Sequence, residues 1–375
     1  MKKVLFVQVS WKSYGGIWQV NKVVAEELIK HGYDVSFAFI RQNKTDYEPE
    51  YDERIKINVI NPNLEWMTHS YRDIIKNKSI DMLKVRINHD RNLKKDKKAF
   101  QKLIRDNKYD YIITTQYELL DLIPKEYLSH VFHEQHTSFE NSWCHRDTKD
   151  ALLRYNNKIN YIWLSKKTME DALDNGLNNC YYLYNPLRFE SEKKSKVNNK
   201  RLVTISRLSK QKRLDKMIDY CEEIFKDKKY KDWVLEIYGD GLQEENLKKL
   251  IHNHRQVKLM GRVDDPIPIL LKSDINLNTS DNEGFPMSIL EACECGIPTV
   301  SLIFGESVYE TILDKETGFI CKDREEFIKR VKELMDDNKL LKEFSDYNIA
   351  FASKFKPDIV VKKWIKMFQE IDNRR

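Results

Sequence analysis

The sequence predicts an α/β protein with two Rossmann-like domains, each built on a parallel, doubly wound sheet. Three observations support this prediction. The chain has 375 residues, which is long for a single hydrophobic core. Short apolar runs alternate with helix-like stretches in the first half, and the alternation starts again after residue 200. Residues 190–200, between the two halves, are charged and poor in apolar side chains, as expected of a linker.

In the first half, the apolar run Val4–Val9 predicts a buried strand. The loop Ser10–Gly16 follows it and leads into a helix that begins near Ile17 and ends by Gly32, a residue typical of helix ends. Further strands are expected at 35–40, 111–115, 130–133 and 161–165, with a polar loop after residue 133 and a helix at 168–175.

The second half repeats this order of elements. The sequence predicts strands at 202–205, 233–238, 257–260, 275–278 and 299–302, with helices at 214–225 and 244–252 among the intervening segments. The final segment, 357–371, has apolar side chains at helical spacing and predicts an amphipathic helix.

Charge is unevenly distributed along the chain. The net charge is +6, and residues 71–110 alone hold 13 Lys and Arg against 6 Asp. This segment is either a solvated helix face or a patch for anionic lipid or an anionic acceptor. Nucleic acid is not expected, because no recognisable binding module surrounds the segment.

No apolar run approaches the ~20 residues that span a bilayer. The start resembles a strand more than a signal peptide, and the six cysteines suit a reducing compartment, so we expect a cytoplasmic protein, with peripheral attachment to the inner membrane face as a further option.

The most informative stretch runs from Thr279 to Pro298. It holds two carboxylates, Glu283 and Glu291, with Gly-Phe-Pro directly after the first and an apolar run before the second. A strand, a turn and a helix start present free backbone N–H groups that favour an anionic ligand. Glu283 is expected on the loop at the mouth of this site. Since eight residues are a little over two helical turns, Glu291 is expected two turns into the helix, on the same face as its start.

A basic stretch opens the second half, at the end of its first predicted strand. Arg207 and Lys212 leave this loop just before a helix. Two cations in that position can neutralise a diphosphate, and the following helix start adds its dipole. A surface basic loop is the alternative, in a chain with 65 Lys and Arg.

Two loops of the first half are weaker candidates. The pair Gly15 and Gly16, between strand and helix, allows the backbone to approach a phosphate closely, but it is not the dinucleotide fingerprint G-x-G-x-x-G. The stretch His133-Glu-Gln-His136 follows a strand. With Cys144 and His145 nearby, a zinc site is conceivable but not favoured, because the spacing H-E-x-x-H is not present.

Together these stretches resemble the motifs of retaining glycosyltransferases of family 4, the glycosyl transferases group 1. The resemblance extends from Leu202 to about Ile320 and is weak in the first half. It departs in one place, since Ser206 stands where the family usually has glycine before the arginine. The resemblance implies the GT-B fold, in which two Rossmann-like domains face each other across a cleft and the last helix crosses back. The expected domains are 1–185 with 357–375, and 186–356.

The resemblance also implies roles for single residues. Arg207 and Lys212 would hold the donor's diphosphate, Glu291 the ribose, and Glu283 the transferred sugar. His136 matches the family's histidine beside that sugar better than His133 does. The remaining expected donor contacts are Gly16, Gly239, Val263, Gly284, Phe285, Pro286, Met287 and Ser288.

The expected activity is therefore transfer of a sugar, with retention, from a nucleotide-diphosphate sugar to a hydroxyl. UDP is favoured because the family most often uses it. The acceptor would be a lipid-linked or polymer glycan of cell wall, capsule or surface polysaccharide. No Asp-x-Asp motif occurs, so we expect no metal and no cofactor. The alternatives are an inverting transferase with His136 as base, a sugar epimerase, a non-catalytic nucleotide-sugar-binding protein, and a binder of membrane or nucleic acid.

Overall fold

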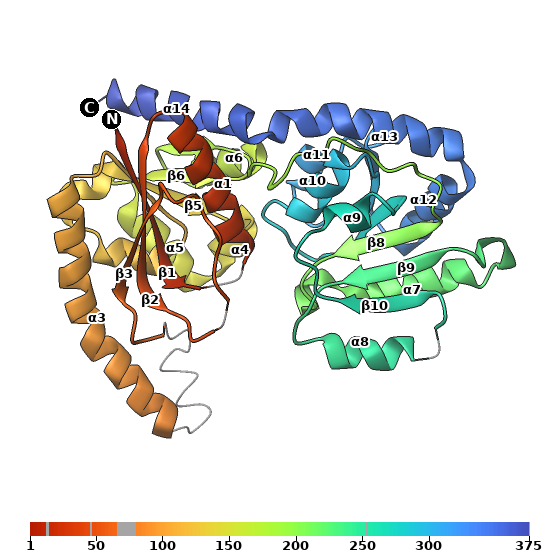
Figure 1. Cartoon of the computed structure of the whole chain (residues 1–375), viewed down its shortest axis with the longest axis horizontal. Helices are drawn as coiled ribbons and strands as arrows, with labels where there is room; N and C mark the ends of the chain where they lie inside the picture. The colour runs from red at the N-terminus through yellow and green to blue at the C-terminus, as the bar shows by residue number, and fades with distance from the viewer. Residues whose placement is uncertain (13–14, 46, 66–79, 253, 375) are drawn as a thin grey trace. The chain divides into compact units, whose positions relative to one another are not determined.

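The computed structural model describes residues 1–12, 15–45, 47–65, 80–252 and 254–374. The chain divides into two compact units, which are residues 1–183 with 361–375, and residues 184–360. Each unit is an α/β layer structure with its own sheet (Figure 1). Residues 71–79 of the basic segment, and Ser13 and Tyr14 of the first loop, lie outside the described residues.

The sheet of unit 1 has the strand order β3-β2-β1-β4-β5-β6-β7, and neighbouring strands run parallel. The order reverses between β1 and β4, so chain connections leave this point in opposite directions and helices cover both faces (Figure 1). The strands are β1 (Lys3–Trp11), β2 (Asp34–Gln42), β3 (Lys56–Asn61), β4 (Tyr111–Thr114), β5 (Val131–Gln135), β6 (Asn160–Trp163) and β7 (Cys180–Tyr182).

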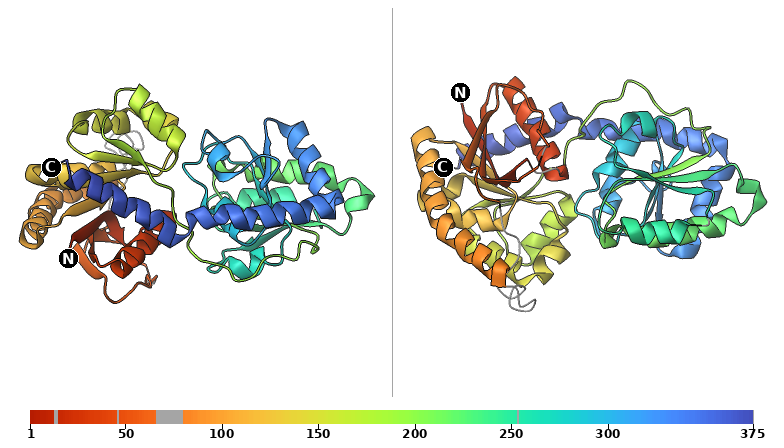
Figure 2. Two further views of the ribbon diagram at one scale, coloured as in Figure 1. Left: turned by 90° about the horizontal axis from the view of Figure 1, so that it is seen from above. Right: turned by 60° about the horizontal axis from the view of Figure 1, so that its bottom comes forward.

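Aromatic contacts show which helix covers which face of this sheet. On one face, Trp18 of α1 packs against Phe37, and Phe368 of α14 stacks on Tyr111 with ring centroids 3.9 Å apart. Figure 2 shows the ribbons of both helices, α1 in red and α14 in blue. On the other face, Phe100 of α3 joins the core cluster that contains several strand residues. The helices of this unit are α1 (Gly16–Lys30), α3 (Ile80–Asn107), α4 (Phe139–Cys144), α5 (Arg146–Tyr155) and α6 (Lys166–Asp174), with 3-10 turns η1 (Tyr117–Leu122) and η2 (Lys125–His130), and α14 (Pro357–Asp372) begins in unit 2.

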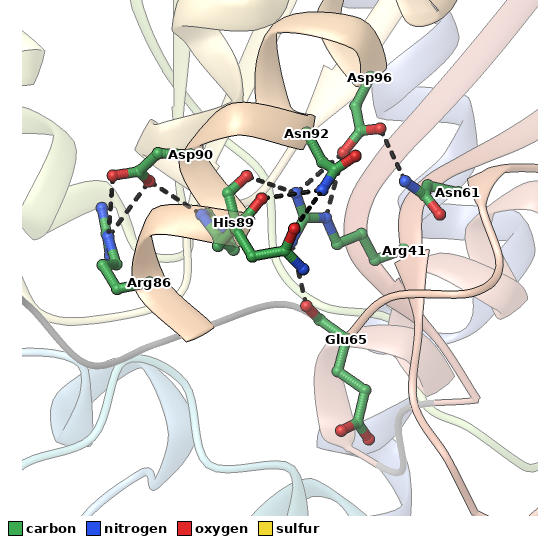
Figure 3. Close-up of polar contacts among 9 residues, drawn as sticks. Arg41, Asn61, Glu65, Arg86, His89, Asp90, Asn92 and Asp96 are labelled. Carbon is green, nitrogen blue, oxygen red and sulfur yellow. Dashed lines mark hydrogen bonds and ion pairs between the residues drawn. The ribbon is translucent and has the colours of Figure 1, made fainter. Parts of the chain in front are cut away.

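A buried ion pair fastens the long helix α3 to the sheet (Figure 3). Arg41, near the end of β2, is 1% exposed, and its Nη2 lies 2.9 Å from Oδ2 of Asp96, which is 4% exposed. Asn61 at the end of β3 donates to the other carboxylate oxygen, and Arg41 also donates to the backbone oxygens of His89 and Glu65. Buried charges need such partners, so this cluster fixes where α3 crosses the sheet edge.

Strand β5 is longer than the sequence predicted. We expected a strand over 130–133 followed by a polar loop, but β5 continues to Gln135. Glu134 and Gln135 pair with Ile162 and Trp163 of β6, so the ladder holds them in extended conformation despite their polarity. The strands β3 and β7 were not predicted, since short half-buried runs give little apolar signal.

The sheet of unit 2 has the order β10-β9-β8-β11-β12-β13, again parallel, with the reversal between β8 and β11. The strands are β8 (Arg201–Ile205), β9 (Val234–Tyr238), β10 (Val257–Gly261), β11 (Ile275–Asn278), β12 (Thr299–Leu302) and β13 (Gly318–Cys321). The helices are α7 (Leu214–Phe225), α8 (Glu244–Ile251), α9 (Ile267–Leu270), α10 (Met287–Glu294), α11 (Val308–Thr311), α12 (Arg324–Asp336) and α13 (Asn338–Ala352), with 3-10 turns η3 (Lys210–Lys212), η4 (Lys228–Tyr230) and η5 (Ser353–Phe355).

The two parallel sheets confirm the predicted fold class of two Rossmann-like units. Among the helices that the structure describes, none combines the length and the apolar character needed to cross a bilayer.

Candidate active site

The two motifs singled out in the sequence meet at the point in unit 2 where the strand order reverses. The loop after β8 carries Arg207 and Lys212, and the loop after β11 carries Glu283. These strands are neighbours, with Ile275 paired to Leu202. In open parallel sheets the crevice outside the carboxyl ends at such a switch point is where ligands bind.

Lys212 and Glu283 form an ion pair through Nζ and Oε1. Their side chains are 15% and 12% exposed, so the pair is largely shielded but open on one side. Between the same two loops, the Asp281 N–H donates to the Gln211 carbonyl at 2.9 Å. The hydroxyl of Thr279 donates to the carbonyls of Lys212 and Arg213 at 3.1 and 3.0 Å. These bonds hold the two motifs as one surface before any ligand binds.

The Arg207 loop rests on the Gly-Asp-Gly turn that follows β9. Leu208 N–H donates to the Asp240 carbonyl at 2.7 Å, and Ser206 N–H donates to the Tyr238 carbonyl. Gly239 has φ +137°, and a Cβ there would lie 1.9 Å from the Ser206 carbonyl oxygen. Glycine at this position is therefore required by the protein's own packing, whatever its role toward a ligand.

Arg207 itself is exposed, and its guanidinium has no ion pair or hydrogen bond with any of the described residues. It differs in this from Arg213, which pairs with Asp215 and Asp281. The loop after β8 thus carries both an exposed guanidinium without a partner among the described residues and the lysine of a shielded Lys–Glu pair. A site of this kind can bind an anionic group bidentately through the arginine.

The second motif carboxylate, Glu291, lies on α10 and is 2% exposed. Its Oε1 is paired with Nε of Arg188, whose side chain is 27% exposed. Sequence analysis missed Arg188, which follows the turn at Asn185 and Pro186 without a recognisable motif. A carboxylate offers about four lone-pair sites, so a ligand hydroxyl could share Glu291 with this arginine.

Among the residues between Glu283 and Glu291, some side chains lie in the hydrophobic core and others lie half-buried at the surface of unit 2. Phe285 is 5% exposed and stacks on Tyr184 at 5.2 Å, so its ring belongs to the core. Pro286 is buried as well, and it caps α10 without a side-chain hydrogen bond. Gly284, Met287 and Ser288 are half-buried. Since the first N–H groups of a helix lack intrahelical acceptors, the backbone here is the part that suits an anion or a sugar hydroxyl.

Val263 lies just past β10, the edge strand of the same sheet, and is half-buried. The strand β10 is two strands away from β8 in the sheet. A ligand with one end at Arg207, after β8, can therefore reach Val263 only with its opposite end.

The predicted residues of unit 1 lie at the carboxyl edge of its own sheet. Gly16 opens α1, is exposed, and has no atom within 4 Å of an added Cβ. His136 directly follows β5, with its side chain 11% exposed and its Nε2 3.5 Å from Oε2 of Glu134. His133, inside β5, is 1% exposed, and burial lowers the pKa of its imidazole to about 3. Of the two histidines, His136 is therefore the one that a ligand can reach.

The fold of two Rossmann-like units is that of solved GT-B glycosyltransferases. The structure is similar to that of a Staphylococcus aureus TarM mutant in complex with fondaparinux, alpha-GlcNAc-glycerol and UDP, with a TM-score of 0.77 at 15% identity over 98% of this chain and 100% of that one. Residues 188–351 match the family model of the glycosyl transferases group 1, so the family match falls on unit 2.

Two curated relatives extend the likeness beyond this match. An uncharacterized glycosyltransferase of Haemophilus influenzae is 26% identical over 97% of this chain and 99% of its own length. The poly(ribitol-phosphate) alpha-N-acetylglucosaminyltransferase of Staphylococcus aureus is 24% identical over 64% of this chain, which covers 49% of that relative.

Proposed function

We propose that this protein is a retaining, metal-independent glycosyltransferase that moves a sugar from a UDP-sugar to a hydroxyl of a polymer or lipid-linked glycan. The observation that carries the proposal is the switch-point site of unit 2. There the unpaired Arg207 lies in the same loop as the shielded pair of Lys212 and Glu283. Uridine diphosphate as the nucleotide is supported by the UDP in the similar TarM complex.

In this mechanism Arg207 and Lys212 bind the diphosphate and stabilise the negative charge that grows as the glycosidic bond breaks. These two cations take the role that a metal plays in other transferases, which is the basis for proposing metal independence. Glu283 is then released from Lys212 to the sugar, because the lysine's charge is shared with phosphate. Glu291 and the first turn of α10 hold the ribose and the sugar hydroxyls.

An anionic polymer acceptor is supported by a basic pocket in unit 1. The pocket has a volume of about 720 Å³ and lies between α3, η2 and α5. Five Lys and Arg side chains and two acidic side chains line the pocket. Both acids are paired with arginines, Glu126 with Arg105 and Asp121 with Arg154. Among the described residues, Lys97 and Lys125 have no ion pair. We propose that this pocket holds phosphate groups of a polyol-phosphate chain, of the kind named for the Staphylococcus aureus relative.

A role of residues 71–110 at an anionic membrane is a further proposal, which liposome co-sedimentation tests.

The test is nucleotide release by the purified protein from UDP-, GDP- and ADP-sugars with EDTA present. Many transferases hydrolyse their donor slowly, so no acceptor is needed. We expect release from a UDP-sugar, and a loss of at least ~100-fold in Glu283→Ala and in Lys212→Ala, the scale of removing a key charge stabiliser. Lys210→Ala is the matched control, since this exposed lysine shares the turn η3 with Lys212. Near-normal release in both site variants would sink the proposal.

An inverting transferase is the second candidate, favoured by the 3.5 Å approach of His136 to the buried Glu134. A histidine beside a carboxylate can act as the general base that inversion needs. The anomeric configuration of the product, measured by proton NMR coupling, decides between the two.

A further inference from the structure

The basic pocket of unit 1 lies at the amino edge of its sheet. The pocket is lined by Arg105 near the end of α3, by Leu128 of η2 and by Lys158 after α5. The next strand in the chain after each of these residues is β4, β5 and β6, respectively. Because these three strands are parallel neighbours, their amino ends meet at one edge of the sheet, and the pocket lies beside that edge.

The expected ligand contacts of unit 1 lie at the opposite edge. Gly16 lies between β1 and α1, and His136 directly follows β5. The five residues of β5 span about 15 Å from one edge of the sheet to the other. Since ligands of open parallel sheets bind outside the carboxyl ends of the strands, a group in the basic pocket is too far away to be the reacting part of an acceptor.

The acids of the basic pocket are neutralised within the protein. Oε1 of Glu126 lies 2.8 Å from Nε of Arg105. Asp121 accepts hydrogen bonds from the hydroxyl of Tyr155 at 2.6 Å and from Nη1 of Arg154 at 3.5 Å. Five cations and two acids leave an excess of three positive charges. Because each acid already has a partner, this excess is available to a ligand.

Lysines carry the available charge of the pocket. Lys97 and Lys125 form no ion pair with the described residues, and Nζ of Lys158 donates to the carbonyl of Arg154 at 2.8 Å. Lys97 is half-buried. A partly shielded ammonium attracts an anion more strongly than a fully hydrated one, so a phosphate that enters the pocket gains more than it would at an exposed lysine.

Helix α3 carries further unpaired cations toward the pocket. Four side chains that are exposed and have no ion pair with any described residue form its basic face, which we define as Arg91, Lys94, Lys95 and Lys98. Their spacings of three, four and seven residues place them on one side of the helix. From Arg91 to Arg105, which lines the pocket, the helix rises by about 21 Å.

The contacts of Asp96 give the direction of this basic face. Arg41, the last but one residue of β2, and Asn61, the last residue of β3, both bind Asp96 (Figure 3). Asp96 is therefore level with the carboxyl ends of these strands. Arg105 lies nine residues further along α3, at the amino edge. The basic face and the pocket together form a row of cations from one edge of unit 1 to the other.

A chain with repeated negative charges matches this row better than a small anion or a lipid surface does. One phosphate can occupy only one part of the row. A lipid surface meets the exposed cations of α3, but it does not enter the pocket that holds Lys97. Several weak contacts to one chain reinforce each other, because each contact after the first forms within the same complex.

We propose that the basic pocket and the basic face of α3 form an exosite that retains an anionic polymer acceptor. The phosphates bound there belong to repeat units away from the reacting hydroxyl. The inference rests on the proposed transferase function and adds that the length of the acceptor governs its affinity. Long chains bind both the exosite and the carboxyl edge, whereas short chains bind the carboxyl edge alone.

The experiment measures binding of poly(ribitol phosphate) and of a short ribitol-phosphate oligomer to the full-length protein by calorimetry without donor. Wild-type protein should bind the long chain at least ~100-fold more tightly than the oligomer, the scale of multivalent binding. Lys97→Gln with Lys125→Gln should weaken binding of the long chain about 10-fold and leave that of the oligomer unchanged. The melting temperature should stay the same, since neither lysine forms an ion pair.

The same double variant should separate KM from kcat in transfer assays. The KM for the long chain should rise with its dissociation constant, while kcat and the KM for the donor stay at wild-type values. A fall in kcat with both chain lengths would place the two lysines in the reaction itself and overturn the exosite.

The matched control removes two positive charges elsewhere, through Lys56→Gln with Lys258→Gln. Lys56 begins β3 at the amino edge of unit 1, Lys258 lies in β10 of unit 2, and both are exposed. The control should bind the long chain as wild type does. Equal weakening in the two double variants would mean that net charge alone attracts the polymer, and would overturn the exosite, as would equal affinity of wild-type protein for long and short chains.

Vesicles of phosphatidylglycerol and phosphatidylcholine test the competing occupant of the basic face. The triple variant Arg91→Gln, Lys95→Gln and Lys98→Gln should weaken binding of the long chain. If it loses co-sedimentation with the vesicles but keeps its affinity for the long chain, the basic face serves a lipid surface and the exosite is wrong.

Donor hydrolysis without acceptor keeps the two proposals separate, because Lys97 and Lys125 belong to unit 1, and Lys212 and Glu283 to unit 2. Hydrolysis of a UDP-sugar by a protein that binds long and short chains equally leaves the transferase and removes the exosite. Length-dependent binding that needs Lys97 and Lys125, without hydrolysis of any donor, leaves the polymer site and removes the transferase.

Discussion

The carboxyl edges of the two sheets share a topology and differ in how their polar side chains are satisfied. In unit 2, Lys212 is paired with Glu283, and Glu291 with Arg188. In unit 1, Nε2 of Gln8 and Oγ1 of Thr115, near the corresponding reversal of strand order, have no hydrogen-bond partner among the described residues.

The two edges therefore differ in how far their polar groups are paired before a ligand binds. Unit 2 holds Lys212, Glu283 and Glu291 in ion pairs before the donor arrives, so less ordering of these groups is needed when the diphosphate binds. Unit 1 leaves the polar atoms of Gln8 and Thr115 unsatisfied, which costs stability. The family match at 188–351 falls on the pre-paired unit, as expected if the donor is shared and acceptors differ.

The largest effect should come from the buried ion pair between Arg41 of β2 and Asp96 of α3, which lies away from the reversal point of the unit 1 sheet. Arg41→Met should lower the free energy of unfolding by about 3–5 kcal/mol, because it leaves Asp96 buried without its cation. Urea unfolding measures this. Arg54→Met is the control, since Arg54 pairs with Asp52 on the surface, where solvent screens the charges, and its loss should leave unfolding nearly unchanged. Equal losses in the two variants would mean that the buried cluster does not anchor α3.

The second largest effect on stability is expected from the ion pair between Arg188 and Glu291 in unit 2, which the sequence analysis did not identify. Arg188→Met should destabilise the protein by about 3 kcal/mol, since Glu291 is 2% exposed and would keep its charge without a cation. Adding Glu291→Gln should restore part of the loss, because the stranded charge is then gone. If the double variant unfolds as easily as Arg188→Met, Glu291 is not held by this arginine.

A pH effect of intermediate size should arise from His133 in unit 1. Burial lowers its folded-state pKa from 6.5 to about 3, so below pH 6.5 the unfolded chain binds a proton that the folded chain does not. Stability should therefore fall as the pH drops from about 6.5 toward 3, by up to ~1.4 kcal/mol per pH unit. His133→Gln should flatten the slope between pH 7.5 and 5 in urea unfolding, and the exposed His252→Gln should leave it unchanged.

The smallest effect on stability is expected at Gly16. An added Cβ meets no protein atom within 4 Å, so Gly16→Ala should change unfolding by under ~1 kcal/mol, toward greater stability. If this glycine makes room for a ligand, the KM for donor should rise while the melting temperature does not fall. Gly32→Ala is the contrast, because φ is +85° there and alanine is strained. An unchanged KM in Gly16→Ala would show that the ligand does not approach this backbone.

Much of the site could be predicted from the chain because its motifs are local. Glu283, Gly284 and Pro286 lie within four consecutive positions of the sequence. A turn followed by a helix start exposes backbone N–H groups, so such a short stretch predicts an anion site by itself. Arg207 and Lys212 likewise follow a strand that the alternation of apolar runs predicts. The likeness in fold to solved GT-B structures supports the architecture, while the roles of these residues stay predictions.

The sequence by itself determined the two α/β repeats, the motif residues and their order along the chain. Only the tertiary structure decided that Arg188 neutralises Glu291, that the ring of Phe285 lies in the core, and that Gln8 and Glu134 share one face of the sheet. The physical reason is that these relations join residues up to 126 positions apart through strand order and register. Local apolar patterns predict strands, but the partner of each strand follows from how the whole sheet packs.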